Sequence, residues 1–145
     1  MSRRQVREKA LQTLYQLELN PDAGRSTIDH TAHGLKKEVR EEDVAFFLRL
    51  TQRGLEKPYQ VDPIIQRYLK EDWTVPRLST IDRSILRLAA FELLFEPDIP
   101  EGVTLNEAVE LAKRFSTGES ARYINGVLGT LVKDLDSIQK EIAGE

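Results

Sequence analysis

The chain has 145 residues, a formal net charge of −3 at pH 7 and no cysteine, which is enough for one domain with its own core and excludes thiol catalysis, cysteine-ligated zinc and disulfides. No apolar run is long enough to cross a bilayer, and the start lacks a signal-peptide core, so we expect a cytoplasmic protein with no membrane partner. Because the overall charge is slightly negative, any nucleic acid must bind at a local basic patch.

A first helix is predicted over residues 2–19, with one apolar face and a basic start. Arg3, Arg4 and Arg7 lie at the end of the helix where cations oppose the macrodipole, so this cluster requires an external anion. Tyr15 projects along the same flank as Arg4. Such a flank could hold a nucleic-acid strand by phosphate contacts and base stacking. A solvated charged terminus with a half-buried tyrosine explains the spacing equally well.

Three more helices are expected before residue 70. Ser26 can cap the first of them, and a second begins at an acidic run at residue 41, which suits the helix dipole. For a short third one, Asp62 looks like the cap and Pro63 like the first helical position, although the helix could begin before them. Residues 71–78 form a connector, in which we expect Trp73 to anchor the chain to the core.

The stretch from residue 79 to residue 95 is predicted to be the central helix, because its apolar residues cover nearly all sides. Ser79 is placed to cap its first turn, with Asp82 near the positive end of the dipole. Glu92 projects among apolar residues. We therefore expect a buried carboxylate with a hydrogen-bonded or charged partner, in a structural and not a catalytic role.

Two capping-box spacings predict the starts of the last helices. Thr104 with Glu107 marks one helix, and Ser116 with Glu119 marks a final helix that continues to Ile142. No strand pattern of useful length appears, so the chain is predicted to be all-α with six to eight helices.

Gly126 and Gly129 interrupt the final helix and share a narrow strip with Arg122. Glycines in a helix interior each cost about 1 kcal/mol relative to alanine. Such a strip either lets a neighbouring helix approach closely or leaves room for a ligand backbone, and close packing is the commoner use.

The residues do not assemble a catalytic or metal site. His30 and His33 have metal-ligand spacing beside Asp29, but no further histidine or cysteine completes a site. A Walker phosphate loop and a dinucleotide glycine motif are also missing. We expect no enzyme activity, no cofactor and no metal.

Four motifs are shared with a known family. They are REKALQTLYQ (7–16), DRSILRLAAFELLF (82–95), NEAVELAKRF (106–115) and YINGVL (123–128). With them, the chain resembles the NusB family of bacterial transcription antitermination factors over nearly its whole length. Residues 20–61 match only as a pattern of helices. The turn STGES, Phe91 in place of a frequent tyrosine and the polar tail after Leu135 depart from the family pattern.

The resemblance implies a compact bundle of about seven helices in two small subdomains, about 1–70 and 77–145, within one RNA-binding domain (1–145). It implies binding to the boxA element of ribosomal operon RNA as a heterodimer with NusE, a small-subunit ribosomal protein. It further implies loading onto RNA polymerase with other Nus factors, and no enzymatic activity.

The resemblance also implies roles for single residues. The first RNA surface matches Arg3, Arg4, Arg7 and Tyr15. The second RNA surface matches Glu119, Arg122 and Tyr123. Asp82 matches a position implicated in the contact with NusE.

Two other functions remain open at this stage. NusB-like domains also occur attached to an RNA methyltransferase, and a helical bundle can serve as a protein-interaction module without RNA. The sequence leaves the oligomeric state open as well, because the apolar stripe ending at Ile142 suits either a second copy or an exposed tail.

Overall fold

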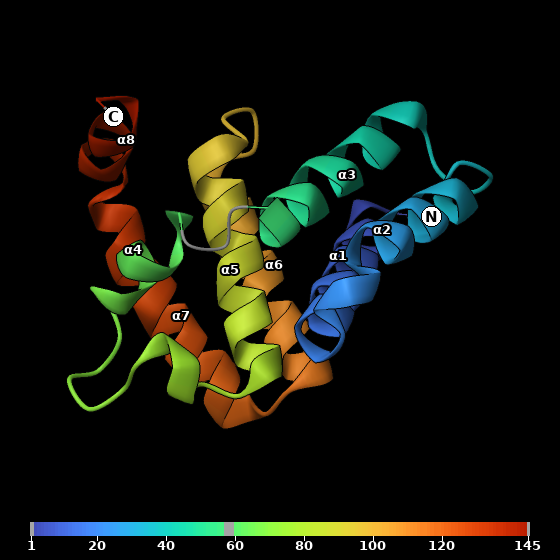
Figure 1. The fold of residues 1–145 in the computed structure, drawn as a ribbon. Coiled ribbons are helices and arrows are strands. Elements are labelled where there is room, and N and C mark those ends of the chain that lie inside the picture. The colour runs from blue at the N-terminus through green and yellow to red at the C-terminus, as the bar shows by residue number, and fades with distance from the viewer. Residues whose placement is uncertain (1, 57–59, 145) are drawn as a thin grey trace. The chain divides into compact units, whose positions relative to one another are not determined.

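The computed structural model describes residues 2–56 and 60–144 and divides into two compact units, Met1–Tyr59 and Gln60–Glu145. Within the described residues the regular structure is helical and no strand occurs, which confirms the predicted all-α class (Figure 1). None of the described helices is both long and apolar enough to cross a bilayer.

The amino-terminal unit contains three α-helices and a short 3₁₀ turn: α1 (Arg3–Leu19), η1 (Pro21–Ala23), α2 (Gly24–Leu35) and α3 (Glu41–Glu56). Helix α1 packs against α2 and α3, and α2 packs against α3 (Figure 1). Val6, Leu14, Phe47 and Leu50 are buried in this unit. The η1 turn lets α2 begin at Gly24, so Ser26 lies inside the helix and the predicted cap there is wrong.

The carboxy-terminal unit contains the remaining helices: α4 (Asp62–Gln66), η3 (Val75–Arg77), α5 (Thr80–Phe95), α6 (Glu101–Phe115), α7 (Gly118–Lys133) and α8 (Leu135–Ala143). Helix α5 contacts α4, α6, α7 and α8, which explains why apolar residues surround it. The predicted cap is confirmed, since the Ser79 hydroxyl accepts a hydrogen bond from the backbone N–H of Asp82 at 3.2 Å.

Glu92 is 2% exposed and accepts a hydrogen bond from the Thr104 hydroxyl at 3.0 Å, which confirms the predicted buried carboxylate. This bond also explains why the predicted capping box at Thr104 is wrong. The cap of helix α6 is Pro100, four residues before the predicted cap, and the Thr104 side chain joins α6 to α5.

The end of the chain differs from the single long helix that the apolar stripe predicts. Thr117, not Ser116, caps α7, and its hydroxyl accepts from the backbone N–H of Ser120 at 2.9 Å. Asp134 then separates α7 from α8, and its carboxylate accepts a hydrogen bond from the Tyr68 hydroxyl at 2.7 Å. The break lets α8 turn its one fully buried side chain, Ile138, toward the unit.

Helix α4 begins one residue before Pro63, as the sequence allowed, and Asp62 is not its cap. Val61 occupies the cap position, and Asp62 is the first helical residue. The Asp62 carboxylate is instead engaged by Arg87 of α5 through two hydrogen bonds of 2.8 and 2.7 Å. This half-buried bidentate pair fixes the short α4 against the central helix.

Candidate nucleic-acid interface

The arginines at the start of α1 differ in how far they are exposed: Arg4 is exposed, Arg3 is half-buried and Arg7 is buried. Tyr15 is half-buried on the same helix. Arg7 is only 4% exposed, so its guanidinium offers little surface to a ligand. The RNA contact expected of these residues stays a prediction, and Arg4 is the cation best placed to make it.

Arg3 meets an anion within its own unit. Its Nε lies 3.3 Å from Oδ1 of Asp43, a residue that is 4% exposed. Its guanidinium carbon lies 4.2 Å from the centre of the Phe46 ring, and that of Arg7 lies 5.4 Å from the same ring. The inference that the whole cluster requires an external anion is therefore wrong for Arg3, because α3 supplies a carboxylate and an aromatic face.

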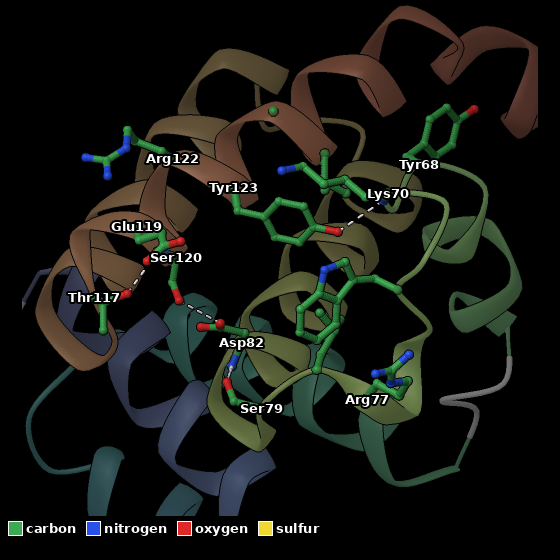
Figure 2. A pocket seen from close by; sticks show the side chains of 14 residues that line it. Tyr68, Lys70, Arg77, Ser79, Asp82, Thr117, Glu119, Ser120, Arg122 and Tyr123 are labelled. Carbon is green, nitrogen blue, oxygen red and sulfur yellow. Dashed lines mark hydrogen bonds between the residues drawn. The ribbon is translucent and has the colours of Figure 1, made fainter.

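A second basic and aromatic surface forms a concavity of about 940 Å³ within the carboxy-terminal unit (Figure 2). One wall is the connector between α4 and α5, and the other is the first half of α7. The residues that line it are Tyr68, Lys70, Trp73, Arg77, Leu78, Ser79, Asp82, Thr117, Glu119, Ser120, Arg122, Tyr123, Gly126 and Val127. All three residues of the predicted second RNA surface are among them.

The ring of Tyr123 extends across this concavity toward the connector, while Arg122 lies on the far side of Tyr123 from Lys70 (Figure 2). The Tyr123 hydroxyl accepts a hydrogen bond from the backbone N–H of Lys70 at 3.2 Å. The Lys70 ammonium lies 5.6 Å from the Tyr123 ring centre. One hydrogen bond and one cation–π contact thus tie the aromatic ring of α7 to the connector.

Trp73 does not anchor the connector in the core, contrary to the prediction. It is 42% exposed and lines the concavity. The backbone, not the indole, holds the connector in place: the Gln66 amide donates to the carbonyl of Trp73 at 2.8 Å and accepts from the N–H of Val75 at 2.9 Å. Trp73 is therefore left partly exposed, as one of the residues that line the concavity.

Arg83 of α5 fixes the following turn of the connector. One of its guanidinium nitrogens donates to the carbonyl oxygens of Val75, Pro76 and Leu78, at 3.3, 3.4 and 2.9 Å. Backbone groups in an irregular segment need partners as much as those in helices do. Arg83 and Gln66 together supply them, so the connector has a defined shape although η3 is its only regular element among the described residues.

Asp82 lies at the edge of the concavity and is engaged within the unit. Its carboxylate accepts hydrogen bonds from the hydroxyls of Ser116 and Ser120, each at 2.7 Å. These bonds tie the start of α5 to the start of α7. They also explain why Ser116 does not cap α7, because its hydroxyl is already directed at Asp82.

Gly126 and Gly129 face open space. Apart from its chain neighbours and the nearby backbone of α7 itself, a Cβ added at either position would meet no described atom within 4 Å. The preferred interpretation of these glycines, close approach of a neighbouring helix, is therefore wrong for the described structure. Gly126 instead lines the concavity beside Tyr123, where a missing side chain leaves room.

The sequence argument missed the connector side of this concavity, namely Lys70, Trp73 and Arg77. A sequence signal for this side did exist, because two cations flank a tryptophan in a segment with neither helical nor strand periodicity. The guanidinium carbon of Arg77 lies 5.6 Å from the Trp73 ring.

Among the described residues, no three histidine, cysteine or acidic side chains come together in a metal-binding arrangement. The side chains that line the concavity offer three kinds of contact to a ligand. Aromatic faces can stack on planar groups, cations can contact phosphates, and the carboxylates of Asp82 and Glu119 can accept hydrogen bonds.

Comparison with known proteins covers most of the chain. The sequence model of the NusB family matches residues 4–133. The transcription antitermination protein NusB of Bacillus velezensis is 41% identical over 137 residues, which cover 94% of this chain and 100% of that protein. The protein of the same name from Bacillus subtilis strain 168 is 39% identical, covering 94% of this chain and 98% of that protein.

Solved structures share the fold. T. maritima NusB superposes with a TM-score of 0.82 at 35% identity, covering 92% of each chain. A structure of the antitermination factors NusB and NusE in complex with double-stranded RNA matches with a TM-score of 0.77 at 23% identity, covering 92% of this chain and 98% of that one. From the family match and these relatives together, we conclude that the chain belongs to the NusB family.

Proposed function

We propose that this protein is a transcription antitermination factor that binds boxA RNA of ribosomal RNA operons together with NusE. The observation that carries the proposal is the family match over residues 4–133, with relatives named transcription antitermination protein aligned along 94% of the chain. The related structure that contains NusB, NusE and RNA supports the same partners. The protein acts in the cytoplasm with RNA polymerase and other Nus factors, and it has no catalytic activity of its own.

Two surfaces are proposed to contact the RNA. The first consists of Arg3, Arg4, Arg7 and Tyr15. Within it, Arg4 pairs with phosphate, Tyr15 offers a stacking face, and Arg3 and Arg7 hold α1 against α3 through Phe46. On a protein whose net charge is −3, such small patches give modest RNA affinity that falls as salt rises.

The second proposed surface consists of Glu119, Arg122 and Tyr123 on α7. Glu119 and Arg122 are exposed, and Tyr123 is half-buried with its hydroxyl held by the connector. Arg122 supplies a cation for phosphate, and Tyr123 supplies an aromatic face for an unpaired base. Glu119 can accept hydrogen bonds from base amino groups.

Asp82 is proposed to serve the contact with NusE. Because its carboxylate already accepts from Ser116 and Ser120, its effect on NusE is exerted partly through the position of α7. NusE binding by Asp82→Asn and by the double variant Ser116→Ala, Ser120→Ala separates these contributions. A loss in the Asp82 variant alone indicates direct contact, whereas equal losses indicate positioning.

The proposal is tested by fluorescence anisotropy with labelled boxA RNA, titrated with and without NusE of the same organism. We expect NusE to tighten RNA binding, and RNA to tighten NusE binding by the same factor. Arg4→Ala and Arg122→Ala should each lower the affinity and reduce the salt slope by about one.

Arg25→Ala is the matched control, because Arg25 is an exposed arginine outside both surfaces that pairs with Glu56 at 2.7 Å. It should leave RNA affinity nearly unchanged. Equal binding by wild type, Arg4→Ala and Arg122→Ala at low salt would contradict the proposed surfaces. Binding to NusE without any binding to RNA would instead favour a protein-interaction module.

A further inference from the structure

We propose that the concavity between the connector and α7 is a nucleobase site, in which one unpaired base of the bound RNA stacks on Trp73 beside Tyr123. The inference rests on the proposed RNA binding and adds the connector residues Lys70, Trp73 and Arg77 to it. These residues come from the structure, because the family resemblance assigned only α7 residues to this surface.

The first argument is the exposure of Trp73. A tryptophan can bury a large apolar area, yet 42% of this one is exposed. The connector that carries it is not loosely attached. Gln66 binds the backbone on both sides of residue 74, and the N–H of Trp73 donates to the carbonyl of Lys70 at 2.8 Å. A large aromatic side chain held at the surface by a fixed backbone is typical of a binding surface.

The second argument is the chemistry around the indole. Arg77 lies 5.6 Å from the Trp73 ring and Lys70 lies 5.6 Å from the Tyr123 ring. The concavity thus contains two aromatic side chains, each with a cation beside it. Proteins that bind single-stranded nucleic acid use this combination, because bases stack on the aromatic rings and phosphates contact the cations. The volume of about 940 Å³ is ample for a base with its sugar.

The third argument is the sign of the charges. Asp82 and Glu119 line the same concavity as the cations. A phosphate deep in the concavity would meet these carboxylates, and so would an acidic peptide. A neutral base avoids that repulsion, and its amino or ring N–H groups can donate to a carboxylate. We therefore assign the base to the interior and its flanking phosphates to Lys70, Arg77 and Arg122.

Trp73 is the only tryptophan of the chain, so its emission reports on this site directly. In a titration of the wild-type protein with single-stranded boxA RNA, we expect the emission to be quenched in parallel with the anisotropy of labelled RNA. The same sequence annealed into a duplex should quench it much less, because its bases are not available for stacking. RNA binding that leaves the emission unchanged overturns the base site but not the proposed function.

Two variants separate stacking from packing. Trp73→Phe keeps a flat ring and should retain most of the RNA affinity, whereas Trp73→Leu keeps apolar bulk and should lose it by on the order of tenfold. Val103→Ala, at a residue of α6 that is 44% exposed and outside the concavity, is the control and should bind RNA like the wild type.

Thermal unfolding of each variant shows whether the fold is intact. Wild-type affinity in Trp73→Leu overturns the base site while RNA binding stands. Failure of the wild-type protein to bind RNA, with or without NusE, overturns both the function and the site.

Discussion

The hydroxyl of Thr104 on α6 donates a hydrogen bond to Oε1 of Glu92 on α5 at 3.0 Å, and each residue is only 2% exposed. A carboxylate so deeply buried depends on its hydrogen-bond partners, because an unsatisfied buried polar group costs about 1–3 kcal/mol. The bond therefore couples the two central helices of the carboxy-terminal unit.

We predict that Thr104→Val lowers the free energy of unfolding by about 1–3 kcal/mol, because it keeps the volume and removes the donor. Urea denaturation followed by circular dichroism measures the change. Thr104→Ser retains the hydroxyl and should lose clearly less. Equal losses in the two variants would mean that the methyl group, not the hydrogen bond, matters at this position.

A second prediction concerns two glycines of the amino-terminal unit. A Cβ at Gly54 of α3 would overlap Cδ2 of Leu14 on α1, a residue that is 6% exposed. Gly54→Ala should therefore force α1 and α3 apart and cost about 1–3 kcal/mol of stability. Gly34→Ala, where a Cβ meets nothing within 4 Å, should stabilise α2 by roughly 0.5–1 kcal/mol.

Urea denaturation of both variants tests this contrast. If Gly54→Ala is as stable as the wild type, Leu14 has another rotamer available and the close approach of the helices is not required.

These contacts show which parts of the fold the sequence could predict. The apolar periodicity of residues 79–95 identifies the central helix, because burial on all sides leaves a pattern within the segment itself. The start of α6 could not be read in this way. Thr104 resembles a cap in sequence, but its hydroxyl donates to Glu92, twelve residues away. A hydrogen bond to a different helix cannot be recognised from the residues next to Thr104.

A third prediction compares two glycines of α7. Both have room for a Cβ, so Gly126→Ala and Gly129→Ala should each stabilise the helix by up to about 1 kcal/mol. Only Gly126 lines the concavity with Trp73 and Tyr123. Its alanine variant should therefore bind boxA RNA a few-fold more weakly, while Gly129→Ala binds normally.

Anisotropy and thermal unfolding, measured on the same samples, check both parts. Equal RNA affinity in the two variants would show that the ligand does not approach α7 at Gly126.

A fourth prediction concerns acid. The hydrogen bonds from Arg67 lower the pKa of Glu141 below its ordinary value of 4.5, and the same pair raises the pKa of Arg67. A carboxyl whose pKa is lowered in the folded state stabilises it above the ordinary pKa, and that contribution disappears as pH falls through the lowered value. The pair joins α8 to the segment that follows α4.

Glu141→Gln should therefore lower the Tm slightly near neutral pH, and the difference from wild type should shrink as the pH falls below 4.5. Because both side chains are largely exposed, the difference should also shrink at high salt. A Tm difference that is constant across pH would show that the pair does not hold α8.

The sequence predicted the α7 side of the candidate site but not the connector side. Tyr123 begins the family motif YINGVL on a helix and Arg122 directly precedes it, so the resemblance drew attention to them. Trp73 lies in a connector whose course is set by Gln66 and Arg83, and nothing in the periodicity tells whether an indole there points inward or outward. The exposure of Trp73 depends on these tertiary contacts, which the local sequence pattern does not reveal.

The grip of Gln66 and Arg83 on the connector has a consequence for chimeras between members of this family. The loop that carries Trp73 takes its shape from two helix residues outside it. A chimera that receives residues 67–79 alone would therefore have the sequence of the loop but lack the hydrogen bonds that fix its conformation. A working exchange must move Gln66 and Arg83 together with the loop, as one cassette.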